Sequence, residues 1–328
     1  MKAIVATKYG SPDILNLEEV EKPAPKDDEV LVKVRAASVN AGDWHLLRAD
    51  PFLTRLAFGL LRPKHKILGA DVAGRVEAVG ANVTQFRPGD EVFGDLSGCG
   101  FGGFAEYVCA GEDALALKPA NKSFEEAAAV PSAAATALQG LRDKGQIQQG
   151  QTVFLNGASG GVGTFAVQIA KSFGAEVIGV CSTSKMDMVR SIGADRVIDY
   201  TRDDFTKNGR RYDLIFAANG NHPISAYKRA LSPEGTYVMS GGSGPQMFQA
   251  MLLGPIISMT GNKKMGNLLK RSNKKDLVVL KEYLEAGKIT PVIDRTYPLT
   301  EVPEAIGYLE NGHARGKVVI TVPGEVAR

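Results

Sequence analysis

The stretch that decides the fold is Thr152–Ala170, which reads TVFLNGASGGVGTFAVQIA. An apolar strand, a glycine-rich turn and an amphipathic helix follow one another in that order. Glycines permit a tight turn and let the backbone approach a pyrophosphate, which free N–H groups at the start of the helix can bind. The turn therefore predicts a dinucleotide site, and four residues are expected to supply its contacts: Ser159, Gly160, Gly161 and Val162.

The turn is a variant of the GxGxxG fingerprint. Gly160 and Gly163 stand at the second and third glycine positions, whereas Ala158 stands at the first. A strand-to-helix turn without any ligand is the simpler alternative. Four glycines between residues 157 and 163 are, however, more than such a turn needs.

Around this stretch, apolar strands and helices alternate, beginning with an Ala-rich helix at Glu125–Arg142. Alternation of this kind predicts an α/β fold with a Rossmann-type, doubly wound parallel sheet over residues 125–265. Residues 1–124 contain short apolar runs broken by Gly and Pro, which predicts a β-rich domain. Residues 266–328 contain two helical stretches and a last strand, Lys317–Val322, and are expected to return to the first domain.

Composition excludes several classes of protein. The chain has 328 residues, enough for two domains, and a formal net charge of +3, too small to indicate nucleic-acid binding. The longest apolar stretch, Ala250–Met259, is about half of what a membrane-spanning helix needs. Six Lys or Arg residues lie in Lys263–Lys275, a basic cluster that we interpret as a solvated face, with membrane contact as the alternative.

The cysteines and the first ten residues indicate the cellular compartment of the protein. Only Cys99, Cys109 and Cys181 are present, and such a sparse, odd set suits a reducing environment. Met1–Gly10 lacks the apolar core and cleavage site of a signal peptide. These features predict a cytoplasmic location.

The end of the second strand of the alternating region bears on the choice of cofactor. An NAD site carries Asp or Glu there, about 20 residues beyond the glycines, to bind the ribose hydroxyls. Val180–Lys185 instead reads VCSTSK. Hydroxyls and a cation, with Ser182 and Lys185 foremost, would receive a 2′-phosphate, so the sequence predicts NADPH. The alternative is that Lys185 is an ordinary exposed lysine at a helix start.

Five motifs together resemble the medium-chain dehydrogenase/reductase superfamily, and within it the zinc-free quinone oxidoreductase and enone reductase branch. They are AASVNAGDW from Ala36, GADVAGRVEAVG from Gly69, NGASGGVG from Asn156, GADRVIDY from Gly193 and GHARGKVVITV from Gly312. The resemblance implies a GroES-like domain formed from both chain ends, a Rossmann domain between them, and a homodimer.

The resemblance also matches individual positions. Those that match the catalytic zinc ligands of the superfamily's alcohol dehydrogenases hold Asn40, Ala70 and Ser132, none of which binds zinc strongly, so no metal is expected. Ser182 and Tyr200 are implied at the adenosine phosphate, and His313, Ala314 and Arg315 near the other end of the cofactor. Tyr200 as half-buried core and residues 313–315 as a plain polar turn are the alternatives.

Without zinc, hydrogen-bond donors must stabilise the charge that develops on a substrate carbonyl. Asn40 is the candidate catalytic residue, because it occupies a position that matches a zinc ligand and its amide can donate a hydrogen bond. The alternative is that Asn40 only stabilises a loop. Asp43 and Asp71 are interpreted as structural or supporting residues.

The function expected from these features is an NADPH-dependent, zinc-independent reductase of quinones or α,β-unsaturated carbonyls. A competing hypothesis is an NADPH-binding regulatory or peripheral membrane protein with little catalysis, which would use the basic cluster Lys263–Lys275. A short-chain dehydrogenase is disfavoured, because its glycine turn would open the chain, whereas this turn begins after residue 150.

Overall fold

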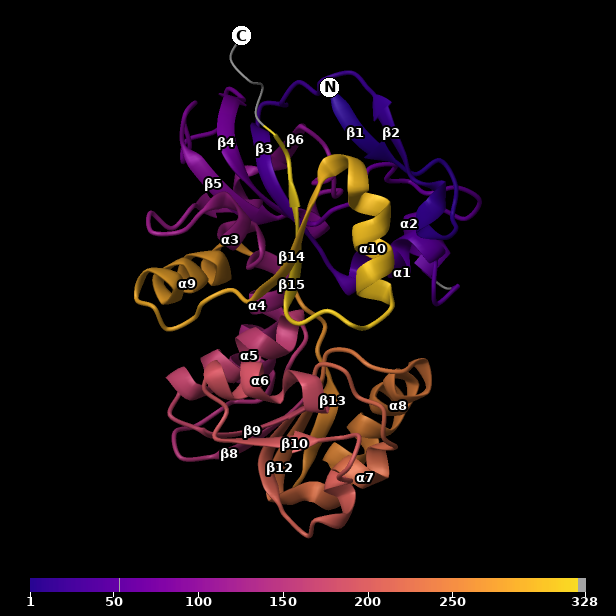
Figure 1. Cartoon of the computed structure of the whole chain (residues 1–328), viewed down its shortest axis with the longest axis vertical. Coiled ribbons are helices and arrows are strands. Elements are labelled where there is room, and N and C mark those ends of the chain that lie inside the picture. Colours follow the sequence, from indigo (N-terminus) through magenta and orange to yellow (C-terminus); the bar gives the residue numbers. More distant parts are fainter. Residues whose placement is uncertain (53, 324–328) are drawn as a thin grey trace. The chain divides into compact units, whose positions relative to one another are not determined.

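The computed structural model describes residues 1–52 and 54–323, so the last five residues of the expected segment 266–328 lie outside the described part (Figure 1). The chain forms two compact units. The first unit combines Met1–Ser132 with Arg271–Gly287 and the described residues from 293 onward. The second combines Ala133–Lys270 with Lys288–Val292. Both ends of the chain therefore build one unit.

The first unit is built on a sheet in which the last strand of the chain pairs with the third. The strands run in the order β14-β15-β3-β4-β5-β7, with β6 also paired to β3, and β1 and β2 form a separate pair. β15 lies antiparallel to β3, with Val318 opposite Val39. The strand bounds are β1 Lys2–Val5, β2 Asn16–Glu19, β3 Glu29–Val39, β4 Asp71–Val79, β5 Glu91–Asp95, β6 Tyr107–Gly111, β7 Leu115–Leu117, β14 Ile293–Pro298 and β15 Lys317–Thr321.

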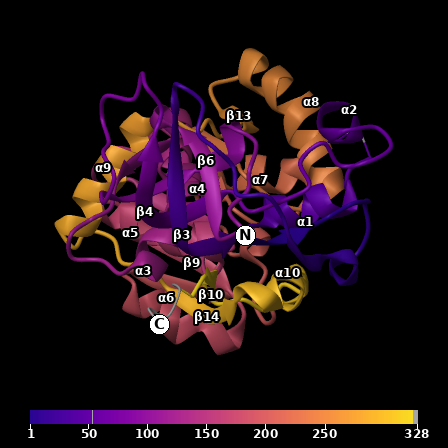
Figure 2. The ribbon, with the colours of Figure 1, turned by 90° about the horizontal axis from the view of Figure 1, so that it is seen from above.

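Helices of the first unit close the core of this sheet. α10 contacts α1 and β14, which lie beside it in Figure 2, and it also contacts β15. Its Val302, Ala305 and Ile306 are fully buried. The helix bounds are α1 Ala41–Arg48, α2 Thr54–Phe58, α3 Phe124–Ala128, α9 Lys274–Glu285 and α10 Val302–Glu310, with short 3-10 turns at Pro12–Ile14, Leu96–Gly98, Glu112–Ala114 and Leu299–Glu301.

The second unit is a six-stranded parallel sheet in the order β10-β9-β8-β11-β12-β13. From β8 the chain extends the sheet in one direction through β9 to β10, and it then extends the sheet in the other direction through β11 and β12 to β13. Right-handed crossovers therefore place α5 and α6 on one face of the sheet and α7 and α8 on the other. The expected α/β fold, with a doubly wound parallel sheet and a β-rich unit formed from both chain ends, is confirmed. The strand bounds are β8 Thr152–Asn156, β9 Glu176–Cys181, β10 Arg196–Asp199, β11 Tyr212–Ala217, β12 Leu231–Met239 and β13 Lys264–Asn267.

The helical part of this region differs from the single helix expected at Glu125–Arg142. The chain instead forms α3, then α4 at Pro131–Leu138, then a π-helical segment at Gln139–Lys144. A proline opens a helix readily but cannot continue one, because it lacks the N–H group, so Pro131 starts α4. The other helices are α5 Gly161–Ser172, α6 Met186–Ser191, α7 Ile224–Ala230 and α8 Gly244–Thr260, with 3-10 turns at Thr183–Lys185 and Phe205–Lys207.

Helix α8 packs along the edge strand β13 and contains the apolar stretch Ala250–Met259. Ala250 and Gly254 are buried beneath the helix, but seven of its large apolar side chains are exposed: Met247, Phe248, Met251, Leu252, Leu253, Ile256 and Met259. Only one side of this apolar helix is therefore buried within its own unit. Among the described residues, no helix is both long enough and apolar enough to cross a bilayer.

The glycine turn joins β8 to α5 with backbone contacts too close for side chains. Gly157 has a φ of +88°, a conformation that favours glycine. A Cβ added at Gly163 would lie 2.0 Å from the carbonyl oxygen of Gly157, whereas one at Gly160 would lie 3.7 Å from it. Gly163 is therefore needed for the packing of the turn itself, and Gly160 is not.

We expect Gly163→Ala to lower the free energy of unfolding by about 1–3 kcal/mol, because the backbone of the turn must shift to make room for the new methyl group. Gly160→Ala is the matched control and should cost less than about 1 kcal/mol. Denaturant unfolding without cofactor measures both values. Equal losses for the two variants would contradict the assignment of the close contact to Gly163.

Candidate functional site

A buried ion pair lies at the centre of the sheet of the first unit. Lys317 is the first residue of β15 and Asp71 the first of β4, and β3 lies between these two strands. Their side chains are 2% and 0% exposed, and Lys317 Nζ lies 3.5 Å from Asp71 Oδ2. Burial lowers the pKa of Lys317, while Asp71 and Asp43 oppose this shift. Two opposite charges removed from water in this way require one another.

The side-chain amide of Asn40 links the two members of this pair. Its Oδ1 accepts a hydrogen bond from Lys317 Nζ at 2.5 Å, and its Nδ2 donates to Asp71 Oδ2 at 2.9 Å. A second Nδ2 contact, to the carbonyl oxygen of Ser38, is long at 3.4 Å. One amide N–H is therefore committed to Asp71, and the other is held only weakly.

Asp71 also lies close to the two other residues that match zinc-ligand positions, Ala70 and Ser132. Its Oδ1 accepts from the backbone N–H of Ser132 at 2.9 Å, and its Oδ2 accepts from the hydroxyl of Ser38 at 2.9 Å. Ala70 precedes it in the chain and is buried. The positions of Asn40, Ala70 and Ser132 are thus gathered around one carboxylate. Within residues 1–52 and 54–323, no group of three or more His, Cys, Asp or Glu side chains could hold a metal ion.

Asp43 holds the loop that carries Asn40. Its carboxylate accepts from the backbone N–H groups of Asn40, at 2.7 Å, and Gly69, at 3.1 Å. Burial raises the pKa of Asp43 to about 7, the Asn40 hydrogen bond opposes this rise, and the charge of Asp71 adds to it. The geometry agrees with the interpretation of Asp43 as a supporting residue, whereas Asp71 touches the candidate catalytic amide directly.

In the second unit, the glycine turn lies at the carboxyl ends of β8 and β11, where the strand order reverses. This is the edge at which open α/β sheets bind their ligands. The first hydrogen bond within α5 runs from Thr164 N to Gly160 O, so the helix itself does not use the N–H groups of residues 161–163. Ser159 is buried in the turn, and Gly160 caps the helix. A turn of this kind, with three N–H groups at a helix start, fits a pyrophosphate.

The ends of β9 and β10 bring Ser182 and Tyr200 to the same edge. Tyr200 N donates to the carbonyl oxygen of Cys181 at 3.1 Å, and the Tyr200 side chain is 59% exposed, so Tyr200 is not a core residue. Lys185 ends the 3-10 turn that follows Ser182 and is half-buried.

An acid that sequence reasoning missed stands at this edge. The carboxylate of Asp199, the last residue of β10, accepts hydrogen bonds from the hydroxyl groups of Thr183 and Thr201. These bonds lower the pKa of Asp199. The rule for NAD sites points to the end of the second strand, β9, whereas this acid stands at the end of the neighbouring strand, β10.

His313, Ala314 and Arg315 lie in the first unit, between α10 and β15, and not in the unit that carries the glycine turn. Ala314 is buried, His313 is exposed, and Arg315 N donates to Asp294 Oδ2 at 3.0 Å. The structure therefore gathers the predicted residues within each unit: Asn40 with its charged partners, and the glycine turn with Ser182, Lys185 and Tyr200.

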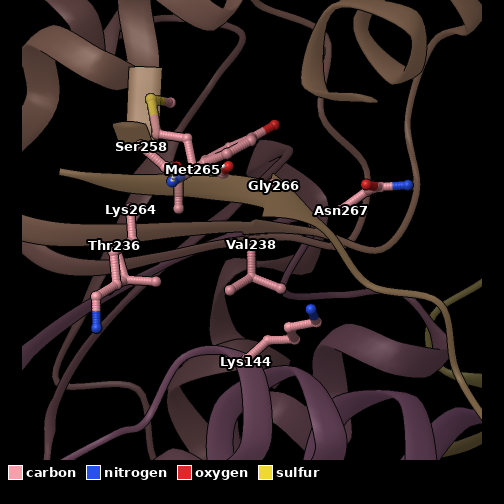
Figure 3. Close-up of a pocket in the computed structure, with 9 residues that line it drawn as sticks. Lys144, Thr236, Val238, Ser258, Lys264, Met265, Gly266 and Asn267 are labelled. Atoms are coloured by element: carbon pink, nitrogen blue, oxygen red, sulfur yellow. Dashed lines mark hydrogen bonds between the residues drawn. The ribbon is translucent and has the colours of Figure 1, made fainter. Parts of the chain in front are cut away.

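Two surface hollows of the second unit lie away from these residues. One, of about 280 Å³, lies between the π-helical segment and the edge of the sheet, where Lys144 extends towards Val238 (Figure 3). The other, of about 600 Å³, lies beside β10 and the loop after it. None of the predicted site residues lines either hollow, so neither takes the place of the candidate site.

Comparison with known proteins places the chain in a family. Residues 26–120 match the family described as "Alcohol dehydrogenase GroES-like domain", and residues 192–320 match "Zinc-binding dehydrogenase". The chain is 38% identical over 333 residues to 2-methylene-furan-3-one reductase of Solanum lycopersicum, covering 98% of this chain and 79% of that protein. It is 35% identical to the chloroplastic NADPH-dependent alkenal/one oxidoreductase of Arabidopsis thaliana, with the same coverage of both chains.

A solved structure agrees with these relatives. The quinone oxidoreductase from Coxiella burnetii superposes with a TM-score of 0.87 at 30% identity, covering 98% of this chain and 99% of that one. The resemblance expected from the five sequence motifs is confirmed. The chain therefore belongs to the medium-chain dehydrogenase/reductase superfamily and is an oxidoreductase of its zinc-free quinone and enone reductase branch.

Proposed function

We propose that the protein is an NADPH-dependent, zinc-independent reductase that transfers a hydride to quinones or α,β-unsaturated carbonyls. One observation carries the zinc-independent part. The positions that match zinc ligands hold Asn40, Ala70 and Ser132. Asn40 and Ser132 donate hydrogen bonds to the carboxylate of Asp71, which is paired with Lys317. The substrate class is supported by the relatives, whose names include a 2-methylene-furan-3-one reductase, an alkenal/one oxidoreductase and a quinone oxidoreductase.

The chemistry needs a donor for the carbonyl oxygen of the substrate. A bound reduced nicotinamide would supply the hydride, and the conjugated carbonyl oxygen of the substrate would gain negative charge during the transfer. A positioned N–H group stabilises that charge. Asn40 is the proposed donor, through the N–H that makes only the long contact with Ser38. A proton from water would complete the reduction.

The residues present fit a phosphorylated dinucleotide. The three N–H groups at the start of α5 suit the pyrophosphate, and Gly163 allows the turn to pack closely enough to present them. We assign the 2′-phosphate of NADPH to Ser182 and Lys185, which offer a hydroxyl group and a cation at the end of β9. The carboxylate of Asp199 is held by the hydroxyl groups of Thr183 and Thr201. The complete proposed set of cofactor contacts is Ser159, Gly160, Gly161, Val162, Ser182, Lys185, Tyr200, His313, Ala314 and Arg315.

The proposal includes a homodimer in a reducing compartment such as the cytoplasm. Seven large apolar side chains are exposed on one helix, α8, and exposed apolar patches mark interaction surfaces, which supports a second copy of the chain as partner. All three cysteines are free, which suits reducing conditions. The Arabidopsis relative is named as chloroplastic, so the comparison does not favour one compartment over another.

The alternative of a regulatory or peripheral membrane protein with little catalysis is weaker. The relatives are named as oxidoreductases over nearly the whole chain. Within the basic cluster, the Lys263 ammonium donates to the backbone carbonyl oxygens of Lys228 and Leu231, so it is not presented to a lipid surface.

The proposed function is tested by oxidation of NADPH with a panel of enones and quinones before and after EDTA treatment. We expect turnover that chelation leaves unchanged. Loss of activity on chelation would contradict the zinc-independent mechanism. NADPH binding without turnover on any compound, together with salt-sensitive binding to anionic vesicles, would favour the alternative.

Cofactor choice is tested by Lys185→Ala. Removing a cation from the 2′-phosphate should weaken NADPH use by about tenfold, or about 1.4 kcal/mol, while NADH use changes little. Arg190→Ala is the control, because Arg190 is exposed on α6, the helix that follows Lys185, and pairs with Asp187 at 2.8 Å. Steady-state kinetics with both cofactors measure the effect. Equal losses with NADPH and NADH would remove Lys185 from the phosphate site.

A further inference from the structure

We propose that Lys317 is a positioning residue for the reduction: it fixes the side-chain amide of Asn40 in the one orientation that leaves an N–H for the substrate carbonyl oxygen. The inference rests on the proposed function, in which Asn40 is the donor. Lys317 was not among the residues that the sequence singled out.

The ammonium group of Lys317 acts only on protein atoms. Its three possible acceptors are Asn40 Oδ1 at 2.5 Å, the Val39 carbonyl oxygen at 3.2 Å and Asp71 Oδ2 at 3.5 Å. An ammonium group has three N–H donors, so these contacts account for all of them. The side chain is 2% exposed. Lys317 is thus placed to act through Asn40 and not by touching a substrate.

The two charges select one orientation of the Asn40 amide. The two ends of an amide have nearly the same shape, but one accepts hydrogen bonds and the other donates them. The ammonium of Lys317 can only donate, and the ionised carboxylate of Asp71 can only accept. A flipped amide would place N–H against the cation and oxygen against the anion, and both hydrogen bonds would be lost. The observed orientation is therefore enforced from both sides.

The same contact strengthens the remaining N–H as a donor. A cation on Oδ1 draws electron density from the amide nitrogen, and hydrogen bonds in a chain of this kind polarise one another. The N–H that makes the 3.4 Å contact with Ser38 is the one left for a substrate oxygen. A negative charge that develops on that oxygen would strengthen this hydrogen bond, which is what stabilisation of the transition state requires.

A purely structural role for Lys317 is the competing explanation, since the residue also neutralises buried Asp71. The two explanations differ in one respect. A positioning residue loses its effect on kcat once Asn40 is removed, whereas a structural residue lowers stability whatever stands at position 40. A double-mutant cycle separates them.

The cycle compares Lys317→Met, Asn40→Ala and the double variant, with Lys118→Met as the matched control. Lys118 lies in the same unit, its side chain is 6% exposed, it pairs with Glu91 at 3.3 Å, and it donates to two backbone carbonyl oxygens. The measurements are kcat, the KM for NADPH and the melting temperature. We expect Lys317→Met to lower kcat by at least about tenfold with little change in the KM for NADPH, and to add nothing in the Asn40→Ala background. Lys118→Met should lower the melting temperature but leave kcat unchanged.

The orientation of the amide can also be followed without any substrate. The Asn40 Nδ2 signal in a ¹⁵N spectrum is assigned by its disappearance in Asn40→Ala. We expect a large shift of this signal in Lys317→Met and none in Lys118→Met. If no compound on the panel is reduced, the proposed function fails, but this spectrum still decides whether Lys317 positions the amide.

If Lys317→Met does not fold, the double variant that carries Lys317→Met and Asp71→Asn is used in its place, because it removes both buried charges together. The double variant should fold, its Asn40 Nδ2 signal should be shifted from the wild-type position, and its kcat should be lower than that of the wild type. An unchanged Asn40 signal, losses in kcat that simply add in the Asn40→Ala background, or wild-type kcat in the charge-balanced pair would each overturn the proposal.

Discussion

The buried ion pair between Asp71 and Lys317 is the interaction on which the first unit and its candidate site depend. The two residues are separated by 246 positions in the chain, and their strands flank β3 on opposite sides. An isolated charge in such a place would cost several kcal/mol, so each residue requires the other. The same pair that joins the last strand to the sheet also orients Asn40.

Much of the fold could be predicted because its signals are local. The glycine turn and the alternation of strands and helices identified the parallel sheet, and the last strand, predicted at Lys317–Val322, was found at Lys317–Thr321. Where a local rule was overlooked, the prediction failed. Pro131 lies inside the expected helix Glu125–Arg142, and a proline at that place divides it into α3 and α4. The exposed side of α8 could not be read from composition, which shows only that the stretch is apolar.

The candidate site was predicted in part. Asn40 was found through its match to a lost metal ligand, but its partner Lys317 lies 277 residues away, and no local pattern joins the two. One signal was available: a lysine at the head of the apolar run Lys317–Thr321 had to be exposed or paired, because buried lysines are rarely unpaired. Asp199 was missed for a related reason, since it reaches Thr183 across neighbouring strands, and only the structure shows which strands are neighbours.

The most direct test of this account is the free energy of unfolding of Asp71→Asn, Lys317→Met and the variant that carries both. If the two charges depend on each other, each single change should cost about 3–5 kcal/mol, because it leaves one charge buried without its partner. The double variant should then lose far less than the sum of the two single losses. Losses that simply add would contradict the account, because they would show that neither charge needs the other.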